Sequence, residues 1–259
     1  MFACLKYFFT HPLARSLDID TPETTLLRSI IIQKKSFLRL LYEQWYSEIL
    51  NLLPLMTIEP ILELGSGAGF LKKFIPNLIT SEILIIHDMD VILDGQHLPF
   101  KKASLRSIVM IDVFHHIPDV KSFLSDAAYC LKPGGNIIMI EPWVTKWSRL
   151  IYKYLHHEPF EPDVKDWSFP KIGPLSSANG ALPWIVFKRD RNRFNRQYCD
   201  LYIKKIHLHT PFSYLLSGGI SLKSFLPGIL FAVCHWIENF IYPFMKFCAM
   251  FAMIVIEKK

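Results

Sequence analysis

A glycine-rich loop and a series of acids are the parts of this sequence best suited to chemistry. The loop, ELGSGAG at 63–69, follows a short apolar run and offers backbone amides with few side chains around them. Acids stand at or near the ends of successive apolar runs, namely Glu82, Asp94, Asp112 and Glu141. Because ligands of open α/β sheets bind beyond the carboxyl ends of the strands, the loop and these acids are expected to surround one ligand.

The residues after the loop restrict the class of that ligand. A phosphate-binding P-loop needs Lys followed by Ser or Thr where Phe70 and Leu71 stand, and a dinucleotide loop prefers Gly or Ala at position 70. An adenosyl ligand without phosphates fits better, since its ribose hydroxyls and its amino groups are donors that carboxylates accept. The acidic surroundings would also suit a positively charged sulfonium.

The elements that must position these residues follow from the apolar pattern of the chain. Short, continuous apolar runs separated by helical periodicity predict a doubly wound α/β fold, with a mostly parallel seven-stranded sheet and helices on both faces. Helical spacing marks 21–53, which begins with the start signal Thr21-Pro22, and 120–131, which precedes a KPGG turn. The expected strands are 61–64, 77–84, 90–94, 106–114, 136–142, 201–209 and 250–257.

Four segments, in the same order, resemble class I S-adenosylmethionine-dependent methyltransferases of the methyltransferase type 11 group. ELGSGAG resembles the cofactor loop of that group, and LDGQHLPF at 93–100 resembles its third-strand motif. IVMIDVFHHIPD at 108–119 resembles the fourth-strand segment, and LKPGGNIIMIEP at 131–142 resembles the junction between helix and fifth strand. The resemblance covers 59–142 well and 198–256 more loosely. It implies a Rossmann-like fold and S-adenosyl-L-methionine as the cofactor.

The resemblance and the strand ends together give the predicted cofactor site. Contacts are expected from Glu63, Gly65, Ser66, Gly67, Gly69, Glu82, Asp94, Gln96 and Asp112. Asp94 would lie at the adenine. The family usually has a fuller helix between the loop and the second strand and then an Asp, whereas here only FLKKFIPN intervenes. We expect Glu82 to hold the ribose, with Asp88 and Asp90 as alternatives.

Two neighbouring histidines are candidates for catalysis. His115 and His116 follow the fourth strand, and a His is suited near neutral pH to orient an acceptor or to take its proton. Alternatively, one caps the following helix and the other packs against the cofactor. No metal site is predicted, because adjacent side chains at a strand end diverge and the sequence indicates no third ligand. Glu141 and Trp143, at the end of the fifth strand, either contact the substrate or are structural.

The remaining segments are expected to cover the site. We predict an N-terminal helical segment over 1–57 and a methyltransferase domain over 58–259, in which 143–197 and 211–248 are insertions that cover the acceptor. The first insertion is rich in Pro and aromatic residues and is expected to be partly helical and partly irregular. The basic stretch at its end, KRDRNRFNR, is expected to be a solvated loop or, alternatively, to bind an anionic head group. The apolar stretch 221–256 is interrupted by charges and prolines, so it falls short of the ~18–20 residues of a spanning helix. It is expected to lie at a membrane surface or to line a pocket.

Composition sets the wider limits. With 259 residues, 51% of them hydrophobic, the chain can bury a large core, and a net charge of +6 argues strongly for neither nucleic acid nor membrane. Five cysteines without C-x-x-C spacing suggest neither a zinc site nor a disulfide framework. The N-terminus lacks the continuous apolar region of a signal peptide, so a cytoplasmic protein is expected, with membrane association as an alternative.

His207 and His209 have no companion residue that could complete a metal site, and both are expected at the surface.

The resemblance implies a methyltransferase that moves a methyl group by direct displacement, and the apolar character of the two insertions predicts a small acceptor of apolar or lipid-like character. The expected partners are that acceptor and, at most, a membrane surface, without nucleic acid and without an obligate protein partner. Two alternatives are a non-catalytic partner subunit that binds S-adenosylmethionine and a membrane-surface protein with the same fold.

Overall fold

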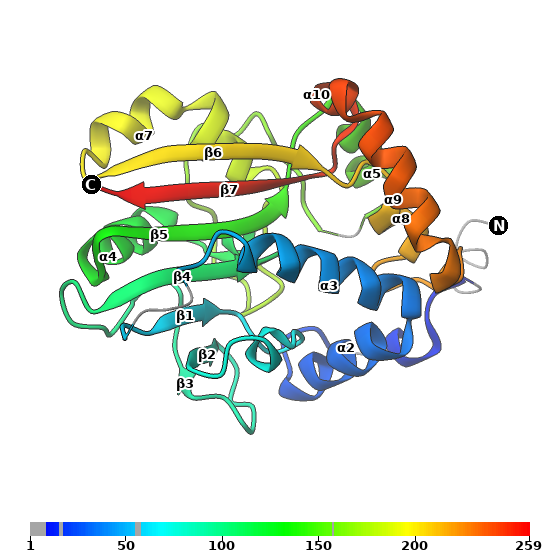
Figure 1. Ribbon diagram of the computed structural model, residues 1–259, viewed down its shortest axis with the longest axis horizontal. Coiled ribbons are helices and arrows are strands. Elements are labelled where there is room, and N and C mark those ends of the chain that lie inside the picture. The colour runs from blue at the N-terminus through cyan, green and yellow to red at the C-terminus, as the bar shows by residue number, and fades with distance from the viewer. Residues whose placement is uncertain (1–8, 16–17, 55–57, 157) are drawn as a thin grey trace.

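A seven-stranded sheet with the order β3-β2-β1-β4-β5-β7-β6 forms the centre of the molecule (Figure 1). The computed structural model describes residues 9–15, 18–54, 58–156 and 158–259, so part of the predicted N-terminal segment lies outside the described residues. The strands are β1 (Ile61–Leu64), β2 (Leu78–Glu82), β3 (Val91–Ile92), β4 (Leu105–Ile111), β5 (Leu131–Pro142), β6 (Leu201–His209) and β7 (Phe251–Lys258). Only β7 runs antiparallel to its neighbours, β5 and β6. The predicted fold class is confirmed.

Apolar clusters fill both faces of the sheet, which is why its strands are apolar without alternation. Val109 in β4 and Ile138 in β5 belong to the cluster that packs against α3 (Ser36–Leu50). Their neighbours Ile108 and Ile137 belong to the cluster on the other face. That second cluster includes the buried side of α4 (Val120–Cys130). From β1 the chain adds β2 and β3 on one side of the sheet and then β4 and β5 on the other. In sheets of this kind, ligands bind at the carboxyl ends of the two strands where this change of direction occurs, here β1 and β4.

The helices begin and end at residues with recognisable signals. The remaining helices are α2 (Pro22–Lys34), α5 (Lys146–Leu155), α6 (Leu182–Trp184), α7 (Arg191–Gln197), α8 (Ser213–Ser217), α9 (Phe231–Phe240) and α10 (Met245–Cys248), with short turns η1 to η6 between elements. Helix α2 starts with Pro22 at its first position, as predicted. Helix α4 is capped by the Asp119 side chain, which accepts from the amides of Lys121 and Ser122. Neither histidine of the 115–116 pair therefore provides that cap.

The segment 143–197 is partly helical and partly irregular, as predicted. Helix α5 is closed at its start by a reciprocal pair, Thr145 and Ser148, in which each side chain binds the backbone amide of the other residue. The basic stretch at 188–196 is not a solvated loop, because it forms the end of the π-helical turn η4 (Ile185–Arg189) and most of α7. Within it, the Arg189 guanidinium binds the carboxylate of Asp190 and two backbone carbonyls.

The glycine-rich loop is followed by a single 3-10 turn, η2 (Leu71–Lys73), and not by an α-helix. Helix α3 lies against the loop instead. The Tyr46 hydroxyl of α3 accepts a hydrogen bond of 3.0 Å from the Phe70 amide, and the two rings pack edge to face. A side chain at Gly69 would collide with this hydroxyl. The N-terminal helices therefore help to shape the loop.

Candidate active site

A cavity of about 720 Å³ lies at the carboxyl ends of β1, β2 and β4, where the strand order reverses. Five of the predicted site residues line it, namely Gly65, Glu82, Asp94, Asp112 and His116. Its other walls come from the N-terminal helices, with Thr25, Arg28 and Tyr42, and from segments that follow β5, with Glu158, Lys171 and Leu222 among them. Segments far apart in the sequence thus enclose one space beside the glycine-rich loop.

The loop needs glycine at two positions for different reasons. Gly65 ends β1 with a φ of +73°, a conformation that other residues rarely adopt, and a Cβ there would lie 2.6 Å from Val113 Cγ2. Gly67 has no such φ, but a Cβ there would lie 2.5 Å from the Glu82 Oε2 and would also overlap the Thr25 methyl group. The absence of side chains lets a carboxylate approach the backbone of the loop.

Glu82 is the acid that meets both the loop and the cavity. Its Oε2 accepts from the Gly67 amide at 3.1 Å, and its Oε1 accepts from the Ile83 amide at 2.8 Å. Burial raises the pKa of Glu82, although these hydrogen bonds act in the opposite direction. The two alternative acids are placed differently: the Asp90 carboxylate binds Thr80 and Lys72, and Asp88 is exposed on a turn. Neither of them lines the cavity.

Four other predicted contacts, Glu63, Ser66, Gly67 and Gly69, do not line the cavity but shape the loop. The Ser66 hydroxyl donates to the Glu63 carbonyl at 3.1 Å, and the Ser66 amide donates to the Ser81 carbonyl at 2.8 Å. The Glu63 carboxyl is buried below the loop, which raises its pKa to about 7. These residues fix the path of the loop between β1 and β2, so we assign them a positioning role.

Asp94 lies at the cavity wall beyond β3 and is held by two partners. Its carboxylate accepts from Lys171 Nζ at 2.8 Å and from the amide nitrogen of the Gln96 side chain at 3.1 Å. Burial would raise the pKa of Asp94, but the hydrogen bonds from Lys171 and Gln96 outweigh it and the pKa is lowered. Asp94 therefore stays ionised beside the cavity. Gln96 does not line the cavity, and it orients Asp94 instead of contacting a ligand directly.

The histidine pair lies directly after β4, and its two side chains do not diverge. The chain turns sharply at Asp112, whose φ is +61°, and continues into the 3-10 turn η3 (Phe114–His116). This turn, unlike a strand, brings the rings of His115 and His116 to a centroid distance of 4.2 Å. The premise on which a metal site was discounted is therefore wrong.

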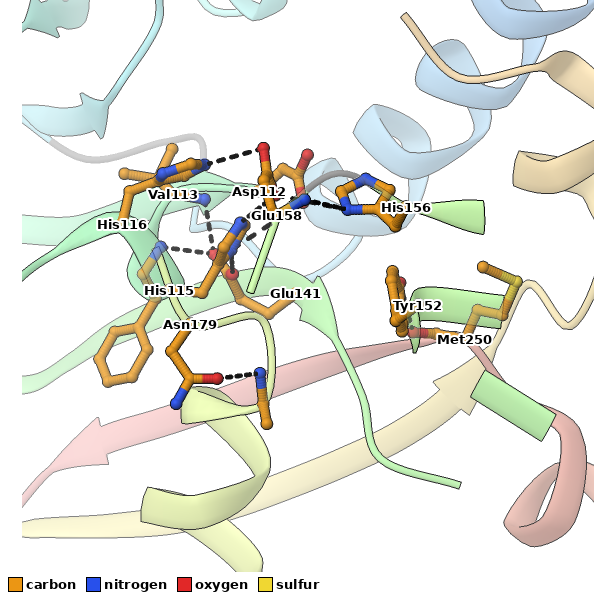
Figure 2. Close-up of polar contacts among 12 residues, drawn as sticks. Asp112, Val113, His115, His116, Glu141, Tyr152, His156, Glu158, Asn179 and Met250 are labelled. Carbon is orange, nitrogen blue, oxygen red and sulfur yellow. Dashed lines mark hydrogen bonds and ion pairs between the residues drawn. The ribbon is translucent and has the colours of Figure 1, made fainter. Parts of the chain in front are cut away.

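Glu141 anchors this turn from below (Figure 2). Its Oε1 accepts from the amides of Val113 and Phe114 at 2.8 and 2.7 Å, and its Oε2 lies 2.7 Å from His115 Nδ1. Both Glu141 and His115 are completely buried. Glu141 and Trp143 do not line the cavity, because Trp143 is packed in the apolar core and Glu141 is sealed under His115. The predicted substrate contacts of these two residues are thus replaced by positioning and packing roles.

The two histidines have opposite protonation preferences. Burial would lower the pKa of His115, but Glu141 and Glu158 raise it well above its usual value. Burial and the neighbouring His115 lower the pKa of His116 to about 4. The Asp112 pKa rises to about 7, chiefly because of burial, while the charge of His115 opposes this rise. At neutral pH, His116 is therefore the neutral imidazole of the pair, and it is the one that lines the cavity.

Several cavity residues were not found from the sequence. Arg28 lies on α2 among the acids and lowers the pKa of Glu82 and Asp112, although other influences on those groups are larger. Glu158 lies 3.5 Å from His115 Nε2 and 3.8 Å from His116 Nε2. Lys171 binds Asp94 from the far side of the cavity. No local motif marks these three residues, since only tertiary folding brings them to the strand ends.

Comparison with known proteins agrees with this geometry. Residues 62–139 match the family model described as a methyltransferase domain. A search of curated proteins found no match.

Solved structures with a similar fold include two methyltransferases. One is the geranyl diphosphate C-methyltransferase of Streptomyces coelicolor, solved with Mg²⁺, geranyl diphosphate and S-adenosyl-L-homocysteine (12% identity, TM-score 0.49, 97% of this chain and 92% of that chain). Another is an S-adenosylmethionine-dependent methyltransferase of Thermotoga maritima (16%, 0.49, 84% and 89%). A complex of Haloferax volcanii that contains a methyltransferase activator is similar as well (12%, 0.48, 83% and 88%).

The site fits an adenosyl cofactor in its own chemistry. Gly65 and Gly67 have no side chain, and a Cβ added at either position would collide with neighbouring atoms. The carboxylates of Glu82 and Asp94 line the cavity and can accept hydrogen bonds. No P-loop Lys is present, because Phe70 and Leu71 occupy the positions concerned. The chain has a Rossmann-like fold, residues 62–139 match a methyltransferase domain, and the residues at the strand ends would fit S-adenosyl-L-methionine as the cofactor.

Proposed function

We propose that this protein transfers a methyl group from S-adenosylmethionine to a small acceptor of apolar or lipid-like character. The observation that carries the proposal is that one cavity joins two chemically different ends. Glu82 and Asp94 lie at the sheet end, whereas Ile151, Ile220 and Phe225 contribute apolar walls. Such a cavity suits a polar cofactor beside an apolar acceptor.

The acidic end would hold the cofactor. Glu82 would accept from the ribose hydroxyls, and Asp94 would accept from the adenine amino group. When bound, S-adenosylmethionine supplies a methyl group on a positively charged sulfur, which a nucleophile can take by direct displacement. Since the leaving thioether is neutral, the residues of this chain need mainly to align the two reactants and to exclude water. The buried loop bonds around Ser66 and Glu82 provide a rigid support for that alignment.

His116 is the residue that we propose to orient the acceptor or to take its proton. It lines the cavity, and its Nδ1 donates to the Ser177 carbonyl at 3.0 Å, so its Nε2 is free of a proton. A pKa of about 4 makes it a weak base, which suits orientation of an acceptor that needs little activation. His115 supports it from the buried side, in contact with Glu141.

The access to the cavity supports an acceptor that arrives from a membrane surface. Helix α5, which lines the cavity, and helix α9 expose large apolar side chains, including Tyr154 (69%) on α5, and Trp236 (68%) and Phe240 (76%) on α9. Helices α9 and α10 lie at the same end of the molecule as α5 (Figure 1), which is also the side of several exposed basic residues, Lys146, Arg149, Lys153 and Lys246. Apolar side chains bordered by Lys and Arg are typical of helices that lie in a membrane interface.

The helices that carry these side chains are each shorter than a membrane-spanning helix. Among the described residues, no single helix has the length and apolar character needed to cross a bilayer. The helices Gly228–Phe240 and Tyr242–Cys248 reach that length and apolarity only as a pair, and they are bent by 63° with respect to each other. We propose that the protein is cytoplasmic and that α9 and α10, which carry exposed apolar and basic side chains, rest on the membrane surface.

A labelling experiment tests the acceptor. The purified chain, without added protein partners, is incubated with S-adenosylmethionine carrying a deuterated methyl group and with separate lipid and aqueous extracts. We expect a labelled product in the lipid extract, and at least ~10-fold less of it with the Glu82→Gln variant when the cofactor is limiting. Label found only in sugars or free amino acids would refute the apolar acceptor. Binding of the cofactor without any product would instead favour a non-catalytic partner subunit.

Vesicle sedimentation tests the membrane contact. The stacked pair Trp236 and Phe240, whose ring centroids lie 6.1 Å apart on α9, is replaced by Trp236→Glu/Phe240→Glu. We expect at least ~10-fold weaker binding to vesicles of mixed phosphatidylglycerol and phosphatidylcholine, because exposed apolar area would no longer be buried. Tyr129→Glu on α4, which changes an aromatic side chain that is 54% exposed, is the matched control. Equal binding of all three proteins would refute the proposed contact surface.

A further inference from the structure

We propose that His115, His116 and Glu158 form a binding site for a single divalent transition-metal ion at the wall of the cavity. One possible ligand atom from each of these three residues lies within 4.8 Å of the other two. Glu158 Oε2 is 3.5 Å from His115 Nε2, and Glu158 Oε1 is 3.8 Å from His116 Nε2. Ligand atoms around a tetrahedral ion at about 2.1 Å lie roughly 3.4 Å apart, so only small movements would close this site.

The second nitrogen of each imidazole is already oriented as it is in metal sites. Nδ1 of His115 lies 2.7 Å from the Glu141 carboxylate (Figure 2). Nδ1 of His116 lies 3.0 Å from the Ser177 carbonyl. Carboxylate and carbonyl partners of this kind fix the tautomer of a ligating histidine and direct Nε2 toward the metal. Glu141 is itself held by the amides of Val113 and Phe114, so the orientation is rigid.

One buried polar atom points into the site and makes only a long contact. His115 Nε2 is completely buried, and its contact there is the ion pair with Glu158 Oε2 at 3.5 Å, with no shorter hydrogen bond among the described residues. Burying a polar atom without a well-formed hydrogen bond costs free energy, so such atoms are uncommon in folded proteins. A metal ion between His115 Nε2 and Glu158 would satisfy this atom and would also neutralise the carboxylate.

The ligand set indicates the kind of ion. Two imidazoles and one carboxylate suit Zn²⁺, Mn²⁺ or Fe²⁺ better than Mg²⁺ or Ca²⁺, which prefer oxygen ligands. Three protein ligands leave at least one coordination position open, as in catalytic metal sites. Because His116 and Glu158 line the cavity, that position would face it. If the proposed function holds, an acceptor oxygen bound there would have a lowered pKa and would lose its proton to solvent more readily.

Metal binding itself, independent of methyl transfer, is the test. Protein without an affinity tag is treated with a chelator, dialysed and titrated with ZnCl₂ by calorimetry, and the metal content is measured by mass spectrometry. We expect one equivalent to bind to the wild type. His116→Ala and Glu158→Gln should each weaken binding at least ~100-fold, and Glu141→Gln should weaken it ~10- to 100-fold.

His207→Ala is the matched control, because His207 is a partly buried histidine of β6 outside the cluster and should leave binding unchanged. X-ray absorption of the wild-type zinc complex provides a second measurement that needs no variant, and it should report two imidazole ligands. Failure of the wild type to bind one equivalent would overturn the proposal. Binding that survives both His116→Ala and Glu158→Gln would overturn it as well. A protein that binds zinc here but transfers no methyl group would refute only the proposed function.

Discussion

Substitution of Gly67 tests whether the bare loop positions Glu82 for the cofactor. In Gly67→Ala, the new Cβ would lie 2.5 Å from Glu82 Oε2, whereas ordinary contacts begin at 3.4 Å. The carboxylate must therefore move by about 0.9 Å, which is the difference between these two distances. Movement in that direction would lengthen the hydrogen bond from the Gly67 amide from 3.1 Å to roughly 4 Å and so break it.

The expected loss of affinity follows from that bond. A hydrogen bond to a charged group contributes about 1.5–3 kcal/mol. At about 1.4 kcal/mol for each tenfold change, displacing the Glu82 carboxylate should weaken S-adenosylhomocysteine binding roughly 10- to 100-fold. Because Gly67 does not have a positive φ, the substitution adds no backbone strain, and the unfolding temperature should fall only by what the lost hydrogen bond contributes.

Calorimetric titration with S-adenosylhomocysteine measures this effect, and two further variants sharpen it. Thr25→Ser removes the methyl group that the new Cβ would also overlap, so Gly67→Ala/Thr25→Ser should recover part of the affinity. Gly134→Ala is the control: its φ is +72° and it lies far from the loop, so it should lower stability by about 1 kcal/mol without changing binding. Unchanged affinity in Gly67→Ala would refute the positioning role of the loop.

Two predictions concern pH and stability. Burial lowers the pKa of Lys35 to about 7 in the folded protein, whereas its pKa in the unfolded chain is about 10.5. The Lys35 ammonium lies near His11 and donates to the carbonyls of Gly219 and Leu222 at the cavity wall. Between pH 7 and pH 10.5 the unfolded state binds more protons at Lys35 than the folded state does, so the wild type should become more stable as pH rises from 7 to 9. The gain should be up to about 1.4 kcal/mol per pH unit. Urea unfolding of Lys35→Met should lack this pH-dependent gain. Burial also lowers the pKa of His209 to about 3. The wild type should therefore lose stability more steeply than His209→Asn as pH falls from 6.5 toward 3. Parallel pH profiles of the two proteins would contradict this reasoning.

Strand positions were predictable from the sequence because a buried parallel strand is apolar along its whole length. The predicted run 61–64 coincides with β1, and 201–209 coincides with β6. The third strand is shorter than predicted, since Asp90 turns its carboxylate to Thr80 and Lys72 and pairing covers only Val91–Ile92.

Side-chain environments that depend on tertiary packing could not be predicted. The surface position expected for His209 is wrong, because its ring packs edge to face against Trp45 of α3 and is buried. Glu158 meets the histidine pair only because the chain returns to the end of β4 after α5. Arg28 likewise lines the cavity from α2, and α3 and β1 separate this helix from the glycine-rich loop in the sequence.

The charge pattern of the histidine pair also required the structure. Adjacent histidines on a strand would point to opposite faces, but the sharp turn at Asp112 places them in a 3-10 turn with their rings side by side. The capping pair Thr145 and Ser148, in contrast, is a local signal that could have located α5 from the sequence.

The most direct test of the central claim compares two acids near the second strand. Equilibrium titration with S-adenosylhomocysteine is carried out on the wild type, on Glu82→Gln, and on Asp90→Asn, whose carboxylate is engaged by Thr80 and Lys72 away from the cavity. We predict one tight site in the wild type, at least ~10-fold weaker binding in Glu82→Gln, and nearly unchanged binding in Asp90→Asn. The account would be contradicted if neither S-adenosylmethionine nor its demethylated product bound to the wild type while NADH or ATP did.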